Sequence, residues 1–307
     1  MFGLKKYNYD SFTRELLHKE MSSLNAGPEA GELAPEFEGR TLSSTTMRLS
    51  DYRGWKNVVL TFGSLTCPMT AGSLAGMNQL AREFGGAAVE FLFVYVREAH
   101  PGERIPAHSS MDEKTRAAEE LRDREVIRMP VIVDGLRGPI HRKYGKMPNS
   151  TFLIDKSGRV AFRAFWTQPN VIHDALEALL ERQRERGVEH AIVHGGEDRS
   201  FPLSYAQVHA YRTLDRAGEK SLSDFREALG TRGSVVLASS RIAGPIALNP
   251  GKAFAAAALA GGVVTAGLVA GYALRKKRLA SRQPYDVYGS PRSARRTGTD
   301  YSEPVGI

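Results

Sequence analysis

The feature that most constrains this chain is an apolar run at residues 58–62 that leads, five residues later, into Cys67 and Pro68. The run is short and rich in β-branched residues, which is typical of a buried central strand. Pro68 suits the first turn of a helix, where its missing N–H is no loss. Apolar residues then recur at spacings of three and four, as on one face of a helix: Leu74, Met77, Ala81 and Phe84. We therefore predict a strand followed by a helix that begins at Cys67.

The position of Cys67 has a chemical consequence. Free N–H groups and the positive end of the helix dipole favour a thiolate over a thiol, so we expect a lowered pKa. The alternative is a small buried apolar residue, which many unpaired cysteines are. Because Cys67 is the only cysteine in the chain, no internal disulfide can form, and a redox cycle at this sulfur requires an external thiol.

The net charge of +8 invites a nucleic-acid interpretation, but the distribution of that charge argues against it. Residues 275–307 contain eight Lys or Arg against three Asp or Glu and so carry +5, which leaves +3 for the first 274 residues. A basic tail beside an apolar segment has a simpler explanation in membrane association. We expect no nucleic-acid partner.

Strand-like and helix-like patterns alternate after the Cys67 helix. Strand-like runs occupy residues 89–96, 130–134, 150–155 and 160–165, and helical patterns occupy 111–125 and 171–186. The last two runs are separated by a short loop with a glycine and predict a hairpin. This order predicts an α/β fold with a central mixed sheet flanked by helices, in which parallel strands are followed by an antiparallel hairpin.

The ends of the chain differ from this pattern. Residues 1–30 predict an amphipathic helix and a linker, with the helix packed on the domain or, alternatively, lying on a membrane surface. Residues 188–250 predict a mostly helical linker region with two short helices, 205–214 and 222–229, and a stretch rich in Ser, Gly and Ala. We find no candidate site in residues 188–250.

Residues 253–274 are 22 consecutive residues without a charge. As a helix they would span ~33 Å, enough to cross a bilayer, and four basic residues follow at once. We predict a single transmembrane helix over residues 251–274 and a disordered basic tail over 275–307; the alternative for the apolar segment is a buried soluble helix. Gly267 and Gly271 would allow two such helices to form a homodimer.

Two features of the sequence give opposite predictions for the side of the membrane on which the catalytic domain lies. The positive residues after the span predict an inward tail and an external domain. The first 26 residues, however, hold no apolar run of the kind found in a signal peptide. We expect a membrane protein whose catalytic domain faces the cytoplasm, where reducing partners are plentiful.

Polar residues follow two of the predicted strands. Cys67 follows one, and Glu98 and His100 follow another, so all three should lie at the same edge of the sheet. His100 could take the thiol proton or stabilise the thiolate, and Glu98 could orient His100. Thr66 and Thr70 offer hydroxyl donors beside the sulfur.

We expect three further histidines to be surface residues: His108, His141 and His173. No cluster has metal-ligand spacing and no glycine-rich phosphate loop is present, so we expect neither a bound cofactor nor a metal.

The residues carry a family resemblance. The runs Phe-Gly-Ser-Leu-Thr-Cys-Pro at 62–68 and Phe-Leu-Phe-Val-Tyr-Val-Arg-Glu-Ala-His-Pro at 91–101 resemble the iodothyronine deiodinase family. More broadly, residues 31–183 resemble a redoxin domain of the thioredoxin fold, and we place this domain at residues 31–187. The resemblance implies reductive removal of a halogen from an aromatic ring, with a thiol reductant of the glutathione or thioredoxin type.

The resemblance also assigns residues. Cys67 matches a position that is usually selenocysteine, and Glu98 and His100 match the Glu and His of the second motif. It implies a cis-proline that faces the active site and contacts substrate, for which Pro148 is the candidate. Thr70 stands where thioredoxins have their second cysteine, so dithiol exchange within the chain is excluded. The family anchor is N-terminal, whereas the predicted one here is C-terminal.

Two alternatives remain open. Cys-Pro-x-Thr is similar to the Cys-Gly-x-Thr of glutathione peroxidases, which implies a one-cysteine peroxidase whose thiolate becomes a sulfenic acid and is restored by an external thiol. The other alternative is a thioredoxin-fold scaffold that docks a partner at the membrane and performs no chemistry.

Overall fold

The computed structural model describes residues 7–22, 25–86 and 88–249. The predicted transmembrane helix at 251–274 and the basic tail at 275–307 lie outside these residues. Within the described ranges, no helix is both long enough and apolar enough to cross a bilayer.

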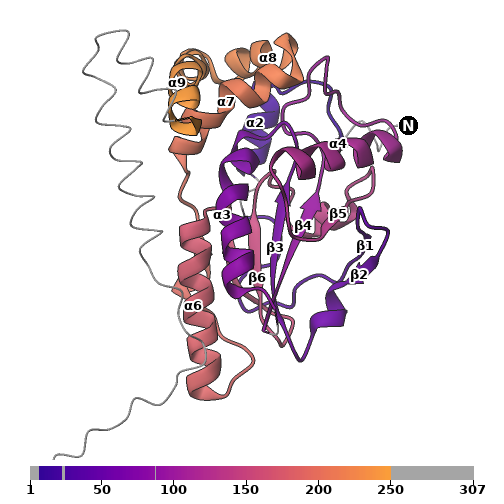
Figure 1. The fold of residues 1–307 in the computed structure, drawn as a ribbon, viewed down its shortest axis with the longest axis vertical. Helices are drawn as coiled ribbons and strands as arrows, with labels where there is room; N and C mark the ends of the chain where they lie inside the picture. The colour runs from indigo at the N-terminus through magenta and orange to yellow at the C-terminus, as the bar shows by residue number, and fades with distance from the viewer. Residues whose placement is uncertain (1–6, 23–24, 87, 250–307) are drawn as a thin grey trace, which may run out of the picture.

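A six-stranded mixed sheet forms the centre of the molecule, in the order β5-β4-β3-β6-β7-β8 (Figure 1). The strands are β3 (Asn57–Gly63), β4 (Val89–Tyr95), β5 (Val131–Val133), β6 (Thr151–Ile154), β7 (Val160–Ala164) and β8 (Glu197–Asp198). β3, β4 and β5 are parallel, whereas β6 runs antiparallel to β3 and β7 antiparallel to β6. The predicted parallel strands and closing hairpin of a thioredoxin-like fold are therefore confirmed.

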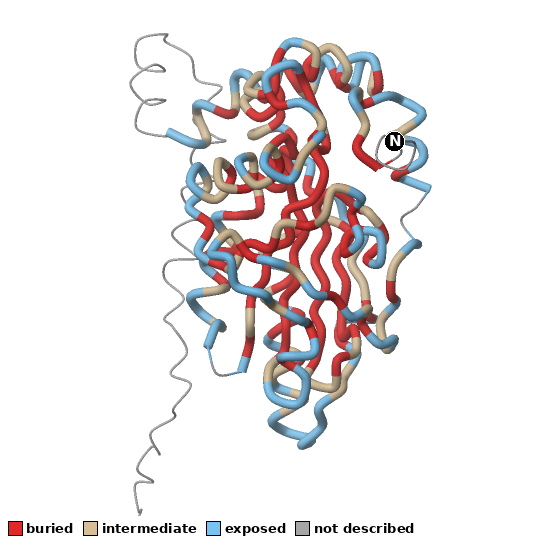
Figure 2. The backbone as a smooth tube through the Cα atoms, turned by 90° about the vertical axis from the view of Figure 1, so that its right-hand side faces the viewer, coloured by how far each residue is buried: buried red, intermediate tan, exposed pale blue. Residues whose placement is uncertain are grey.

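Helices cover one face of this sheet. These are α3 (Pro68–Phe84), α4 (Met111–Arg124) and α6 (Pro169–Arg186), and they pack on strand residues such as Val59 and Phe91. The intervening residues Leu60 and Leu92 point to the opposite face, as the two-residue period of a strand requires. The strands are buried along almost their whole length (Figure 2).

The opposite face is covered by shorter elements. The hairpin β1 (Glu38–Arg40) and β2 (Thr46–Arg48) and the short helices η1 (Leu49–Tyr52) and α5 (Pro139–Lys143) belong to this side, with Phe37 and Tyr144 in its core. A further short helix, η2 (His194–Gly196), precedes β8.

A glycine allows β3 to turn directly into α3. A Cβ at Gly63 would lie 2.6 Å from the ring of Phe93 and 2.8 Å from the side chain of Thr70. Such distances are shorter than any real Cβ contact, so only glycine lets the strand end this close to the start of the helix. The loop that carries Cys67 is thereby held against the end of β4.

Four more helices gather at one end of the molecule (Figure 1). They are α2 (Arg14–Ser22), α7 (Leu203–Ala217), α8 (Glu219–Leu229) and α9 (Thr231–Leu248). They share an apolar core with Phe12 that is separate from the two cores of the sheet. We call Phe12 and these four helices the helical cap. The predicted helices at 205–214 and 222–229 are confirmed as α7 and α8, whereas α9 was not predicted.

Candidate active site

Cys67 lies where the sequence places it, between β3 and α3. It is the N-cap residue of α3, with φ −92° and ψ 115°, and Pro68 occupies the first turn. The carbonyl of Cys67 accepts the first helical hydrogen bond, from the amide of Ala71 at 3.2 Å. The predicted strand–cysteine–helix arrangement is therefore confirmed.

The environment of the sulfur differs from the prediction. Cys67 is 2% exposed and packs in an apolar cluster with Met69, Ala99, Ala206 and Tyr205. Burial raises the pKa of Cys67, and hydrogen bonds from Thr70 and Met69 offset this only in part. The expected lowering of the pKa is wrong for this conformation, because desolvation of an anion outweighs the helix N-terminus.

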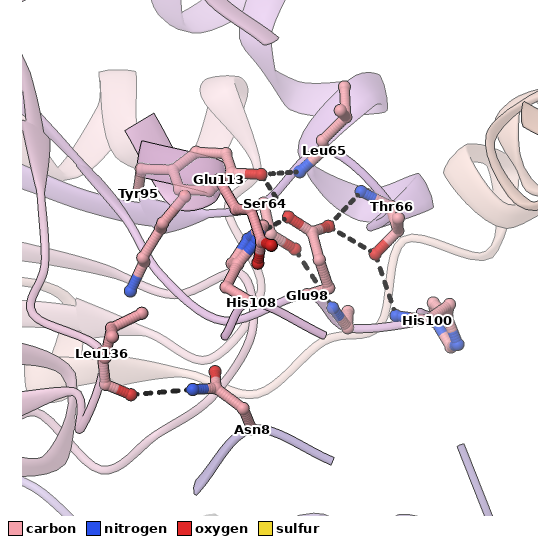
Figure 3. A network of polar contacts seen from close by, with 12 residues as sticks. Asn8, Ser64, Leu65, Thr66, Tyr95, Glu98, His100, His108, Glu113 and Leu136 are labelled. Atoms are coloured by element: carbon pink, nitrogen blue, oxygen red, sulfur yellow. Dashed lines mark hydrogen bonds and ion pairs between the residues drawn. The ribbon is translucent and has the colours of Figure 1, made fainter. Parts of the chain in front are cut away.

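A buried carboxylate forms the centre of the polar network beside Cys67 (Figure 3). Oε2 of Glu98 accepts hydrogen bonds from the amide of Thr66 at 2.9 Å and from its hydroxyl at 2.7 Å. Oε1 accepts from the hydroxyl of Tyr95 and from Nε2 of His108, the latter at 2.9 Å. Glu98 thus has partners on both oxygens and touches the residue that precedes the cysteine.

These contacts decide the charge of Glu98. Burial alone would raise its pKa, but the hydrogen bond and charge of His108, with the hydrogen bonds from Tyr95 and Thr66, lower the pKa below its ordinary value. Glu98 is therefore an anion at neutral pH although it is almost fully buried.

The ring of His100 points away from Glu98 (Figure 3). Only its backbone amide joins the network, donating to the Thr66 hydroxyl at 3.0 Å. The ring instead packs against Phe12 and Phe225, with centroids 4.4 and 5.5 Å away. The prediction that Glu98 orients the imidazole of His100 is wrong in this conformation.

The surroundings of the His100 ring keep it neutral. Its Nδ1 is buried and has no hydrogen-bond partner within the described residues. Burial lowers the pKa of His100 to about 4, although the charges of Glu98 and Asp224 oppose the shift. No hydrogen bond within the described residues joins this ring to the sulfur of Cys67.

The histidine that does pair with Glu98 is His108, which the sequence assigned to the surface. It is 5% exposed, and its ring also lies near that of Tyr95. The loop after β4 returns His108 to the strand end, a fold-back that no local pattern encodes. The only available signal was its position within one loop of the Glu98 motif.

The other two histidines that were expected at the surface are His141, which is buried, and His173, which is partly buried. His141 is fully buried, with Nδ1 2.8 Å from the Tyr7 hydroxyl and Nε2 2.8 Å from the carbonyl of Met147, so its assignment to the surface is wrong. His173 lies on α6 beside Asp174 and Glu177, a grouping compatible with a metal ion, but both carboxylates are largely exposed. Exposed acidic groups near a histidine are common without any metal.

The two threonines lie beside the cysteine loop as expected. Thr66 bridges Glu98 and the amide of His100, and Thr70 hydrogen-bonds the sulfur and accepts from the amide of Ser64 at 3.4 Å. Pro148 is buried in a turn before β6. Since no peptide bond is cis within the described residues, the expectation of a cis-proline there is wrong.

A buried ion pair joins the N-terminal segment to the end of β4. Nη2 of Arg97 lies 2.8 Å from Oε1 of Glu20, and the guanidinium also lies over the rings of Tyr7 and Tyr9. The hydroxyl of Tyr9 donates to the carbonyl of Ala99 at 3.0 Å. Residues before the sheet domain therefore help to enclose the site.

A family model described as iodothyronine deiodinase matches residues 7–184, more than half of the chain. The chain is 28% identical over 161 residues to a type I iodothyronine deiodinase of Xenopus laevis, covering 50% of this chain and 63% of that protein. It is 31% identical over 126 residues to a type II iodothyronine deiodinase of Petromyzon marinus, covering 38% and 43%.

The alignments thus span less than two thirds of these relatives. Among solved structures, a putative thiol:disulfide interchange protein DsbE from Chlorobium tepidum has 22% identity and a TM-score of 0.41, over 50% of this chain and 98% of that one. A peroxidoxin BcpB from Mycobacterium tuberculosis has 19% identity and a TM-score of 0.39, over 50% and 97%.

Proposed function

The chain belongs to the iodothyronine deiodinase family, and we propose on this basis that it is a thiol-dependent oxidoreductase with Cys67 as its nucleophile. The observation that carries the proposal is the buried anion of Glu98, which contacts the residue next to the cysteine through two hydrogen bonds. A structural protein gains little from an anion in this position, whereas a reaction that moves protons can use one.

Cys67 is suited to attack once it is exposed. It stands at the N-terminus of α3, and hydrogen bonds from Thr70 and Met69 favour its anion. When the burial that opposes ionisation is relieved, these hydrogen bonds and the helix dipole remain. Access to the sulfur and its activation are therefore linked.

The leading reaction is reductive dehalogenation of an aromatic ring. The thiolate of Cys67 attacks the halogen, so that a sulfur–halogen bond forms while the carbon–halogen bond breaks and the carbon takes a proton. An external thiol displaces halide from the sulfur to give a mixed disulfide, and a second thiol releases Cys67. Two thiols become one disulfide, and the ring, a halide ion and a proton complete the balance.

The donors around the Glu98 anion are suited to supply the proton. Tyr95 and His108 both hydrogen-bond Oε1, while Thr66 bonds Oε2 and adjoins Cys67. A proton bound by this group can reach the Thr66 hydroxyl without crossing solvent. In this proposal His108 has the role that was predicted for the ring of His100.

A peroxidase is the second candidate, and the contact between Thr70 and the sulfur favours it. There the thiolate attacks one peroxide oxygen, the other leaves as an alcohol or water after taking a proton, and Cys67 becomes a sulfenic acid. Two external thiols then reduce it and form a disulfide and water. Glu98 and Thr66 would serve the leaving oxygen.

Membrane attachment and reductant belong to the same proposal. Residues 251–274 would anchor the chain with the sheet domain towards the cytoplasm, where glutathione or thioredoxin can supply the thiols. A scaffold that docks a partner at the bilayer is the outcome to expect if neither reaction is found.

The deciding experiment measures two products with the same preparation. Halide release from a halogenated phenol and loss of a peroxide are each followed with excess thiol, for the wild type and Cys67→Ser. Halide release that requires Cys67 supports the leading reaction, and peroxide loss that requires it supports the second. Glu120→Gln, at an exposed pair on α4, serves as the control for preparation. Absence of both activities from a folded wild type would refute the enzyme proposal.

A further inference from the structure

Half of the residues that cluster around Cys67 come from the C-terminal helices. Ala206 and Tyr205 belong to α7 and Val236 belongs to α9, and all three join the apolar cluster around the sulfur. They lie beyond residue 184, where the family match ends. Part of the enclosure of the thiol therefore comes from residues outside the family match.

The helical cap is a unit with its own interior. Phe12, Leu214, Leu222, Phe225 and Leu237 form an apolar core that is distinct from the two cores of the sheet. An element with its own core can separate from its neighbour without unfolding, provided that the contacts between them are weak.

Apart from the buried ion pair between Glu20 of α2 and Arg97, the polar contacts between cap and sheet domain are of a kind that can be exchanged. The Ser221 hydroxyl donates to the carbonyl of His100 at 3.0 Å, and the carboxylate of Glu103 accepts from the amides of Glu219 and Lys220 at 2.7 and 3.0 Å. Water can replace each of these bonds at a small net cost. These bonds hold the cap in one position on the sheet domain, but they do not prevent it from opening.

Within the described residues, the closed interface also leaves a ring nitrogen of His100 unpaired. Nδ1 of His100 is buried without a partner within the described residues, while Phe12 and Phe225 enclose the ring from two parts of the cap. A buried nitrogen without a partner destabilises the closed arrangement. Opening would remove this cost, because water or a bound molecule could then hydrogen-bond the nitrogen.

From these observations we propose that the helical cap is a lid, closed in this structure, which must move away from α3 before any reactant reaches Cys67. The inference rests on the proposed function only in naming Cys67 as the group to be reached. Alkylation of the thiol measures access whether or not the chain is an enzyme, so the two proposals can fail separately.

Two glycines on the same helix provide a matched test. A Cβ at Gly72 would lie 2.5 Å from Cγ of Tyr205 in the cap, whereas a Cβ at Gly76 would lie 2.5 Å from Cγ of Pro169 at the start of α6. Both changes to alanine favour the helix and place the new Cβ equally close to its nearest neighbour. Only Gly72→Ala pushes against the cap.

The experiment follows alkylation of Cys67 by iodoacetamide in the full-length chain, at one pH, by mass spectrometry. For the wild type we expect a rate at least about a hundredfold below that of the denatured chain. We expect Gly72→Ala to raise that rate by about tenfold and Gly76→Ala to leave it within about twofold of the wild type. Thermal unfolding establishes that each variant is folded.

Any one of three results would refute the proposal that the cap is a lid. They are a wild-type rate equal to that of the denatured chain, no increase in folded Gly72→Ala, or an equal increase in both variants. If Gly72→Ala does not fold, the same comparison is made between Phe225→Ala in the cap and Phe84→Ala at the end of α3. Only the first of these should accelerate alkylation, and equal rates would again refute the proposal.

Discussion

Nε2 of His108 lies 2.9 Å from Oε1 of Glu98, and neither side chain is exposed by more than 3%. A buried carboxylate needs such a partner, because an unpaired anion away from water would take up a proton instead. The pair lies beside Thr66 at the cysteine loop. Removing one member of this pair should therefore destabilise the fold.

We expect Glu98→Gln to lower the free energy of unfolding by about 3 kcal/mol, the cost of removing one member of a buried pair. The amide cannot accept from all of the donors that Glu98 satisfies, so at least one is left unpaired. Urea denaturation measures the change. Glu120→Gln, at an exposed pair with Arg124, should cost no more than about 0.5 kcal/mol. Equal losses would contradict the assignment.

The second prediction concerns stability at mildly acidic pH. His100 has a pKa lowered to about 4 in the folded chain, against about 6.5 when unfolded. Between these values the unfolded state binds more protons, so stability falls as pH drops from about 6.5 to about 4. Glu98 acts in a lower window, because its pKa lies below the ordinary value of 4.5 and its contribution is lost only as pH falls through the folded pKa.

His100→Phe isolates this effect, because a phenyl ring suits the space beside Phe12 and Phe225. We expect the variant to lose about 2 kcal/mol less stability than the wild type between those pH values. The whole pKa shift would correspond to a larger difference in stability. We expect a smaller one because His100 as a residue is only partly buried, so that solvent screens its charge. The measurement is urea denaturation at a series of pH values. Parallel curves for the two proteins would show that folding does not lower the pKa of His100.

The sheet and its helices could be predicted because their patterns are local. The strand-like run at 89–96 and the helical spacing on 171–186 appear as β4 and α6 within a few residues. Cys67 at the start of α3 follows from Pro68 in the same way. Each of these elements is fixed by neighbours in the sequence, and the tertiary fold did not override them.

The environment of the site could not be predicted because it depends on distant segments. Burial of Cys67 comes from Ala206 and Val236, and the partner of Glu98 is brought back by the loop that carries His108. Helix α9 shows no amphipathic period from which it could be predicted, because small and apolar residues occur on most of its sides. Long-range packing, which no short window contains, reversed the expected direction of the cysteine's pKa shift.

The third prediction tests the bridge made by Thr66. Its hydroxyl donates to Glu98 and accepts from the amide of His100, so Thr66→Val leaves that buried amide without its acceptor. We expect a loss of about 2 kcal/mol of unfolding free energy. Thr45→Val, at an exposed position, should change stability by less than about 0.5 kcal/mol. If the two variants are equally stable, the bridge contributes nothing to folding.

The last prediction concerns the resting state of Cys67. Because burial raises its pKa, titration of the thiolate by ultraviolet absorbance should give a midpoint above that of a free thiol, with Cys67→Ser as the blank. Thr70→Val removes the hydroxyl that favours the anion, so the midpoint should rise further. A midpoint below that of a free thiol would mean that the sulfur is solvated and anionic at rest, and that the closed arrangement around it is not the one populated in solution.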